Sequence, residues 1–314
     1  GATWTPSARV GTQVGSLDAL WYRNGRIYAG TTAHGVYVSN NLGASWSQFN
    51  TGLTGGIGNS QLWINDFEAR GDYLYAATAG AGVYRVQHTA PVAWQRFGTE
   101  LVPNQAGDVN DIQLAGGRLI ATGGSNGQIF WNDLGQSGWT ESFLNNSGLL
   151  PGLQPSGIGW TGSQVVIGSS IGSYCSAQGQ SPWTYTGPSI GGLLESRYAN
   201  RGSELHVALN RGTGVVMAKS TDHGSTWTNL QSLPTYVYEL AVQDTTLYAA
   251  RIDGLWVASI ATVSVPDGTP GDRVRLAFSL DGPHAVRDRA RFRHGLSDPQ
   301  HVTLRVFDVA GREM

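Results

Sequence analysis

The segment "STDHGSTW" at residues 220–227 brings together the side-chain types that nucleophilic enzymes use, since Ser220, Asp222 and His223 are close neighbours in the chain. A serine, an imidazole and a carboxylate act together when they are hydrogen-bonded in series. The segment "SNNLGASW" at residues 39–46 has the same spacing of Ser, Gly and Trp, with Asn41 in place of the acid. Both segments also suit a tight turn, in which the Asp or Asn side chain accepts backbone N–H groups and Gly adopts a positive φ. We therefore interpret the motif as structural, comprising Ser220, Asp222, Gly224 and Trp227 in one copy and Ser39, Asn41, Gly43 and Trp46 in the other.

A second set of candidates consists of carboxylates at matching offsets in a repeat that is described below. Five of its six copies have an acid at this offset and the remaining copy has Gly157; the acids are Asp18, Asp66, Asp111, Glu195 and Glu239. Carboxylates crowded at one end of a channel bind a cation such as Ca²⁺ or include a group with a raised pKa. The alternative, which we favour, is that each carboxylate accepts backbone N–H groups of the next repeat.

Basic and aromatic residues form a third set of candidates, expected on the same face as the acids. They are Arg197, Arg211, Arg251, Tyr236, Tyr238, Trp63, Trp160 and His34. Aromatic platforms beside arginines and carboxylates suit a sugar or a peptide strand, although each residue also suits ordinary packing. Five other arginines are expected at turns on the opposite face as solvated residues: Arg23, Arg26, Arg70, Arg118 and Arg201.

The elements that would position these residues are short strands in a repeat. Apolar anchors recur every 40 to 47 residues, at Ile27, Leu74, Leu119, Val165, Leu205 and Leu247. Around the first anchor, alternating apolar residues predict strands over 17–23, 26–32, 35–39 and 45–50. Four short strands per unit at this period are typical of a β-propeller.

Tryptophans support the same repeat count. Each of five repeats closes on one of Trp46, Trp94, Trp139, Trp183 and Trp227, and the sixth repeat has none at that place. Trp4 supplies the missing residue from the other end of the chain. The sequence therefore predicts an all-β fold, a six-bladed β-propeller over residues 1–265 that the N-terminal strand closes.

The composition fits this fold and narrows the range of partners. The 314 residues include 44 Gly and 11 Trp, only 13% are charged, and the net charge of −2 gives no reason to expect nucleic acid as a partner. Cys175 is the only cysteine, which excludes an internal disulfide. No apolar run is long enough to span a bilayer. The opening "GATWTPSAR" is not a signal peptide, so we expect either a cytosolic protein or a signal that has been removed.

The motif Ser-x-Asp-x-Gly-x-x-Trp at Ser220, Asp222, Gly224 and Trp227 resembles the Asp-box of bacterial-neuraminidase-type (BNR) repeats. The resemblance covers most of residues 1–262. It implies a propeller whose motif hairpins lie at the periphery, away from the ligand face. The Asp-box proteins include sialidases, xyloglucan-cleaving glycosidases, sorting receptors and a photosystem II assembly factor.

The sialidases of this group imply an alternative catalytic site, with three arginines that hold a carboxylate and a Tyr–Glu pair. Arg197, Arg211, Arg251, Tyr238 and Glu239 are the residues that could fill these roles. The three arginines fall in two adjacent repeats, however, and "SARVGTQVG" stands where the family has Arg-Ile-Pro.

The composition changes after Val265, since residues 266–314 contain eight of the 20 basic residues and no Trp. The segments "ARFRHGL" and "HVTLRVFDVAGRE" resemble the FlgD-like immunoglobulin module of secreted bacterial proteins, many of them cargo of type IX secretion. The resemblance implies an incomplete Ig-like module over 266–314, export, and an extracellular or cell-surface location with the signal peptide removed.

The function that we predict from the sequence is a non-catalytic binding or scaffold module for a glycan or an extracellular protein. No cofactor is expected apart from possible binding of Ca²⁺ by the acids above. A sialidase-like glycoside hydrolase is one alternative. The other is a structural surface or filament subunit that self-assembles through its C-terminal tail.

Overall fold

The computed structural model describes most of the chain between residues 8 and 259. The described ranges are 8–11, 16–98, 108–123, 127–134, 136–145, 152–187, 193–243, 246–251 and 254–259. The chain divides into two compact units, of which Pro6–Ser259 is one and Gly1–Thr5 with Ile260–Met314 is the other. The Ig-like module that the sequence predicts over 266–314 lies outside the described residues, as does Trp4.

The unit Pro6–Ser259 is all-β. Its described elements are 23 strands and one short 3₁₀ helix, η1 (Ile57–Leu62). The strands of the first three sheets are β1 (Leu17–Arg23), β2 (Arg26–Thr31), β3 (Gly35–Ser39), β4 (Ser47–Gln48), β5 (Ile64–Arg70), β6 (Tyr73–Thr78), β7 (Gly82–Gln87), β8 (Gln95–Arg96), β9 (Asp111–Ala115), β10 (Arg118–Thr122), β11 (Gln128–Asp133) and β12 (Thr140–Phe143). Those of the last three are β13 (Pro155–Trp160), β14 (Val165–Ser169), β15 (Gly172–Ser176), β16 (Thr184–Gly187), β17 (Leu193–Arg201), β18 (Glu204–Arg211), β19 (Gly214–Ser220), β20 (Thr228–Leu233), β21 (Val237–Gln243), β22 (Thr246–Arg251) and β23 (Gly254–Ser259).

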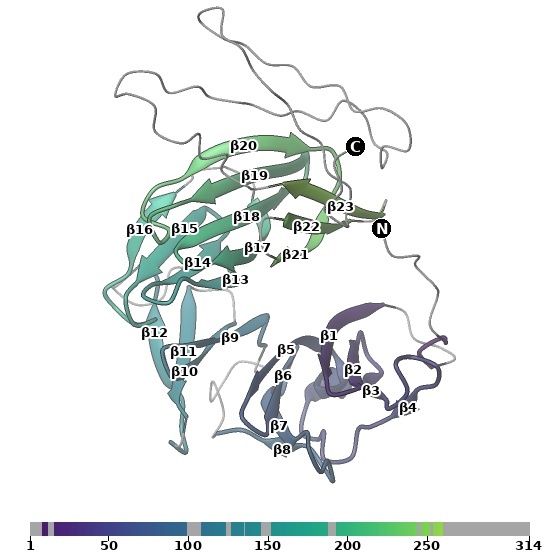
Figure 1. Cartoon of the computed structure of the whole chain (residues 1–314). Coiled ribbons are helices and arrows are strands. Elements are labelled where there is room, and N and C mark those ends of the chain that lie inside the picture. Colours follow the sequence, from purple (N-terminus) through teal and green to yellow (C-terminus); the bar gives the residue numbers. More distant parts are fainter. Residues whose placement is uncertain are drawn as a thin grey trace, which may run out of the picture. The chain divides into compact units, whose positions relative to one another are not determined.

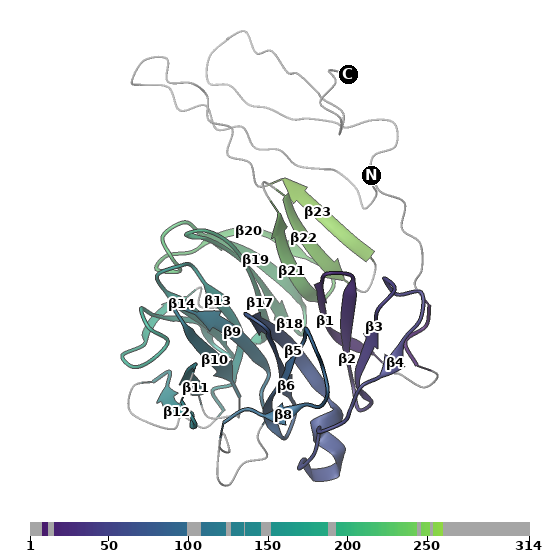
Figure 2. The same ribbon diagram turned by 60° about the horizontal axis from the view of Figure 1, so that its bottom comes forward.

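Each repeat of the sequence forms one antiparallel sheet, which confirms the predicted all-β repeat. The first five sheets have four described strands in chain order, and the sixth sheet has three, β21–β22–β23. The first strands of successive sheets pack side by side, from β1 against β5 to β17 against β21 (Figures 1 and 2). In the first sheet β1 and β3 have the predicted bounds, β2 ends one residue early, and β4 is shorter than the predicted 45–50.

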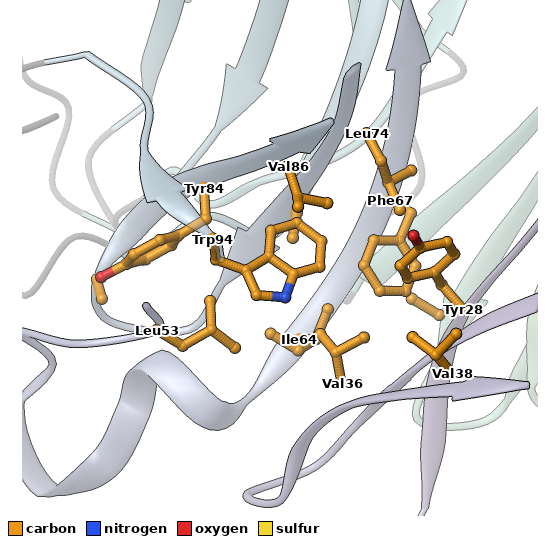
Figure 3. Packing of buried hydrophobic residues seen from close by; sticks show 13 residues of the cluster. Tyr28, Val36, Val38, Leu53, Ile64, Phe67, Leu74, Tyr84, Val86 and Trp94 are labelled. Carbon is orange, nitrogen blue, oxygen red and sulfur yellow. The ribbon is translucent and has the colours of Figure 1, made fainter. Parts of the chain in front are cut away.

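The interface between the first and second sheets contains the largest apolar cluster found among the described residues. It contains Tyr28, Val36 and Val38 from the first sheet and Phe67, Leu74 and Val86 from the second (Figure 3). Trp94, only 2% exposed, lies among them and stacks on Phe67 with ring centroids 6.3 Å apart. This Trp, which closes the second repeat, therefore packs between two sheets.

The indole N–H groups of these tryptophans follow one rule. Trp94 and Trp139 each donate to the carbonyl oxygen of the residue three positions after the preceding closing Trp, namely Phe49 and Phe97, at 3.0 Å. Trp183 donates to the hydroxyl of Ser142 at 2.9 Å and Trp227 to that of Thr186 at 3.4 Å, again three positions after the preceding Trp. Each donor thus links its sheet to the one before it.

Trp46 is the first member of this series, and no sheet precedes it in the chain. Its indole nitrogen is buried and has no hydrogen-bond partner among the described residues. By the rule above its acceptor would be Ser7, three positions after Trp4, and both lie outside the described residues.

Candidate functional site

The Ser-x-Asp-x-Gly segments form the same turn in two sheets. The Ser220 hydroxyl donates to Asp222 Oδ1 at 2.7 Å and accepts the Gly224 N–H at 2.8 Å, while Asp222 Oδ1 accepts the Thr226 N–H at 2.8 Å. Ser39, Asn41, Gly43 and Ser45 make the equivalent three bonds at 2.9, 2.8 and 2.9 Å. Gly224 and Gly43 both have φ of 85°. Both segments therefore form the hydrogen-bonded turn that their residue types suit.

The histidine of this segment does not complete a catalytic series. His223 Nδ1 lies 3.0 Å from the hydroxyls of both Ser163 and Thr161, which belong to the preceding sheet. Burial opposes ionisation of Asp222, but hydrogen bonds from Thr226 and Ser220 outweigh it and hold the pKa of Asp222 below its ordinary value. The Asp222 carboxylate is an acceptor in a turn, and Ser220 is committed to the same turn.

The arginines expected to be solvated turn residues lie at those turns, where Arg23 and Arg70 are exposed, but most of them also link neighbouring sheets, which the sequence analysis missed. Arg23, Arg70 and Arg118 donate through Nη1 to the carbonyl oxygens of Gly71, Gly117 and Gln178 in the next sheet, at 2.9, 2.9 and 3.1 Å. Arg26 donates to the carbonyl of His88 at 2.7 Å. Arg201 pairs within its own sheet with Glu204, at 3.1 Å. An arginine side chain is long enough to reach the adjacent sheet, and the position of the arginine in the repeat does not show this.

The structure also corrects the register of the predicted carboxylate set. The residue three positions beyond each apolar anchor pairs with Asp66, Asp111 and Glu239 in the second, third and sixth sheets. In the second and sixth sheets this acid directly follows a β-bulge near the start of the first strand, and the residue in the same place is Ala19 in the first sheet and Glu195 in the fifth. Asp18 is therefore displaced by one residue, whereas Glu195 is at the predicted place. The equivalent positions hold four acids, Ala19 and Gly157.

Asp66 and Asp111 accept backbone N–H groups from the next sheet, as the favoured alternative predicts. Asp66 Oδ2 accepts the Ile112 N–H at 3.1 Å and Asp111 Oδ2 accepts the Ile158 N–H at 2.7 Å. The residue before each acid adds a second link, because the Asn65 amide donates to the Val109 carbonyl and the Asn110 amide to the Pro155 carbonyl. The repeated Asn-Asp pair in "INDF" and "VNDI" is the sequence signal that could have revealed this double link.

Asp18 and Glu239 bond differently. Asp18 accepts the hydroxyls of Ser16 and Thr32, within its own sheet. Glu239 Oε1 accepts the N–H of Leu240, the next residue, at 3.0 Å. Among the described contacts, the link to the next sheet is found for Asp66 and Asp111.

Asp66 and Asp111 are also close enough to affect each other. Burial raises the pKa of Asp66 well above its ordinary value, and the negative charges of Asp111 and Glu239 raise it further. Burial raises the pKa of Asp111 as well, and the hydrogen bond with Asp66 and the charge of Arg197 oppose that rise. The two carboxyls therefore titrate as an interacting pair and not independently. Among the described residues, no three His, Cys, Asp or Glu side chains gather as a metal site, and Ca²⁺ binding stays a prediction.

The loops before the first strands carry two of the other candidates. Trp63 follows η1 and is 45% exposed. His34 Nδ1 lies 3.1 Å from the carbonyl of Thr32, and the His34 carbonyl accepts the amides of Gln48 and Asn50. No described contact joins Trp63 or His34 to the tyrosines and arginines of the fifth and sixth sheets.

The remaining candidates gather where the fifth and sixth sheets meet. We name the segment Pro234–Tyr238 the tyrosine ledge. The Asn210 side chain fixes it by accepting the Val237 N–H and donating to the Val237 carbonyl, both at 2.8 Å. The ring centroids of Tyr236 and Tyr238 are 5.1 Å apart with planes inclined at 49°, and Tyr238 is 49% exposed. Two aromatic rings on a fixed main chain form a preorganised contact surface.

Two of the three candidate arginines contact the tyrosine ledge. Arg197 donates through Nε to the Tyr238 carbonyl at 2.8 Å. Arg251 is 6% exposed, lies over the Trp256 ring at 4.3 Å and donates through Nε to the Thr235 hydroxyl at 2.8 Å. Arg211, next to Asn210, is half-buried and takes no part in these contacts. Asn210, Thr235 and Trp256 were missed from the sequence, because their partners are distant in the chain.

We compared the chain with known proteins once this geometry was established. No protein-family model matches the chain, and no curated protein matches it. In the part of the chain that the structure describes, no helix is long and apolar enough to cross a membrane.

Solved structures show the fold. The chain is similar to YCF48 bound to D1 peptide, with a TM-score of 0.58, 14% identity, and 80% of this chain and 79% of that chain covered. It is similar to the extracellular domain of the putative one component system BT4673 from B. thetaiotaomicron, with a TM-score of 0.61, 15% identity and coverage of 80% and 33%. The computationally designed Ika8 protein gives a TM-score of 0.54, 11% identity and coverage of 78% and 71%. At these identities the likeness shows a β-propeller fold and no more.

Proposed function

We propose that this protein is an exported, non-catalytic propeller that binds a partner molecule at the tyrosine ledge. The observation that carries the proposal is the Tyr236–Tyr238 pair, of which Tyr238 is exposed and Tyr236 half-buried, on a main chain held by Asn210. Exposed tyrosines on a rigid support are typical of binding surfaces, because they supply contact area with little loss of side-chain entropy. Similarity to YCF48, which was solved bound to a peptide, is consistent with this use of the fold.

Two finer features belong to the same proposal. The turns at Ser39–Trp46 and Ser220–Trp227 have the residues of the Asp-box family, and the N-terminal strand with Trp4 closes the ring. Export and a place at the cell surface rest on the resemblance of residues 266–314 to FlgD-like modules of secreted proteins.

The hydrogen bonds of the arginines favour binding over the sialidase alternative. A clamp of Arg197, Arg211 and Arg251 would need three guanidinium groups free to hold one carboxylate. Arg197 and Arg251 instead donate to Tyr238 and Thr235, and Arg251 is deeply buried. A sialidase would hydrolyse a fluorogenic sialoside in a manner that Arg211→Ala abolishes. We expect no turnover. If the wild type does hydrolyse the sialoside and Arg211→Ala does not, the sialidase alternative replaces this proposal.

Binding itself is tested with peptide and glycan arrays probed by the full chain. We expect bound array members whose signal falls about tenfold or more in Tyr238→Ala, the usual effect of removing an exposed aromatic anchor. Tyr22→Ala is the matched control, because Tyr22 is 59% exposed on β1 and lies outside the ledge. Absence of binding, or an equal loss in both variants, would refute a binding site at the ledge.

A further inference from the structure

The outer strand of the fifth sheet, β20, is longer than the outer strands of the other four-stranded sheets. β4 and β8 have two residues each and β12 and β16 have four, whereas β20 has six. The strand order β17–β18–β19–β20 leaves one side of β20 without a neighbouring strand (Figure 1). A strand at the edge of a sheet offers a row of main-chain N–H and C=O groups to another chain.

β20 is also exposed along its length. Its first five residues, from Thr228 to Ser232, are exposed, and Leu233 is half-buried. Among the described elements, only β19 is hydrogen-bonded to these six residues. The main-chain groups on the outer side of β20 therefore face solvent and are accessible to a partner.

The sequence of β20 lacks most of the features that protect an edge strand. Natural edge strands are guarded by short length, charged side chains, proline or a β-bulge. The six residues TNLQSL include no charge and no proline, whereas β8 and β12 carry Arg96 and Glu141. The sixth sheet ends on β23, whose outer edge is where the N-terminal strand would close the ring. β20 is thus the least guarded outer strand of the described four-stranded sheets.

One guard is present, and it limits the shape of the partner. A β-bulge at Leu230 separates the pair Asn229–Ala218 from the pair Gln231–Met217. Such a bulge bends the strand and increases its twist locally. A flexible segment can follow this bend, whereas a rigid strand edge would have to match it.

The size of the edge also favours a flexible segment over a second copy of this chain. Six residues of strand span about 20 Å. Two folded copies that meet only along such an edge would bury much less than the roughly 1,200 Å² of a specific interface. An added peptide strand needs no such area, because main-chain hydrogen bonds supply its affinity.

We propose that β20 is a strand-addition site, where an extended, uncharged segment of a partner protein pairs with the outer edge of the fifth sheet. The side chains of Thr228, Asn229, Gln231 and Ser232 offer hydroxyl and amide groups, which suit a polar, β-forming segment. The inference does not depend on the tyrosine ledge, because it uses the main chain of β20.

The test uses fluorescence anisotropy of a fluorescein-labelled Gly-Ser-Thr-Val-Thr-Val-Thr-Ser-Gly peptide with the full chain. A form that is N-methylated at every Thr and Val has no main-chain donor on either edge, and a form methylated only at Val keeps one edge. We expect the unmodified peptide to bind saturably and the fully methylated form to bind about tenfold or more weakly, since two or three hydrogen bonds are lost. The Val-methylated form should still bind. Absence of saturable binding, or equal binding of all three forms, would overturn the inference.

A charge placed on β20 locates the binding site. In Gln231→Glu, a peptide with Lys in place of its central Thr should bind about two- to fivefold more tightly than one with Glu there, because opposite charges attract across paired strands. Thr184→Glu is the matched control, because Thr184 is exposed on the outer strand β16 and the variant has the same net charge. No preference in Gln231→Glu, or the same preference in Thr184→Glu, would contradict a site on β20.

Amide hydrogen exchange provides a second measurement. We expect the peptide to slow exchange in Thr228–Leu233 and to leave Thr184–Gly187 unchanged. Peptide binding without protection of β20 would overturn the inference. Protection that grows with protein concentration in the absence of peptide would also overturn it, since the occupant would then be a second copy. Tyr238→Ala should keep the protection of β20, so failure here and failure of the proposed function are distinguishable.

Discussion

Replacing Trp46 with phenylalanine tests whether the N-terminal segment closes the ring. The buried Trp46 indole nitrogen lacks a hydrogen-bond partner among the described residues. Each of the four later tryptophans donates to the residue that lies three positions after the preceding closing Trp. If Ser7 is the missing acceptor, phenylalanine at position 46 removes one buried hydrogen bond. If Ser7 is elsewhere, the same change removes only ring volume.

The magnitude follows from the equivalent bond of Trp94, which spans 3.0 Å to the Phe49 carbonyl. A neutral hydrogen bond of this kind contributes about 0.5–1.5 kcal/mol to the free energy of unfolding. The loss of ring volume adds to this in any Trp→Phe variant, so the comparison must cancel it. A double-mutant cycle does so, by measuring Trp46→Phe in the full chain and in a chain that lacks residues 1–7.

The assay is urea unfolding followed by tryptophan fluorescence and circular dichroism. We expect Trp46→Phe to destabilise the full chain by about 1 kcal/mol more than it destabilises the shortened chain. Trp94→Phe is the control and should cost the same in both, since its acceptor is Phe49. A coupling free energy of zero between Trp46 and residues 1–7 would refute closure through Ser7.

Two further predictions concern the packing of the sheets. Gly52 has φ of 89°, and a Cβ there would collide with the Trp94 carbonyl oxygen, whereas Gly55 has φ of 93° and open space around it. Both Gly→Ala variants should lose about 1–2 kcal/mol of unfolding free energy through backbone strain. Gly52→Ala should lose several kcal/mol more because of the collision. Equal stabilities of these two variants in urea would contradict the close approach of Gly52 to Trp94. The raised pKa of Asp66 means that its folded form holds a proton more tightly than its unfolded form, so its contribution to stability is complete below the unfolded pKa of about 4 and is lost as pH rises through the folded pKa. In Asp66→Asn the stability should therefore fall less steeply as pH rises through the folded pKa, and Asp18→Asn is the control. If the stabilities of the wild type and of Asp66→Asn instead rise in parallel over this pH range, the prediction is wrong.

The repeat and its strands were readable from the sequence because they depend on local periodicity. Anchors such as Leu74 and Leu119 are buried at matching places in their sheets, and the turn at Ser220 has the hydrogen bonds that its residue types predict. These features involve residues close together in the chain. Their geometry is set mainly by backbone preferences and by alternating burial.

The candidate site was less predictable because it depends on the register of the strands and on side chains that contact a neighbouring sheet. Asp18 lies inside the β-bulge between Leu17 and Ala19, whereas Asp66 directly follows the equivalent bulge of the second sheet, and the sequence does not show where a bulge falls. The clamp between Asn210 and Val237 joins two sheets across 27 positions. Arg211 looked equivalent to Arg197 and Arg251 in the sequence, and only their hydrogen-bond partners separate the three.

The links between sheets have a consequence for how the repeats can diverge. The donors are particular side chains, such as Trp94, Arg70 and Asn65, but their acceptors are the main-chain carbonyls of Phe49, Gly117 and Val109. A carbonyl is present whatever residue occupies the position, so mutation of the accepting residue leaves the bond possible. Selection then acts on one partner of each link that ends on a main-chain carbonyl, and the residue that carries the carbonyl is free to change. Repeats held in this way can lose most of their mutual identity while their sheets keep the same spacing.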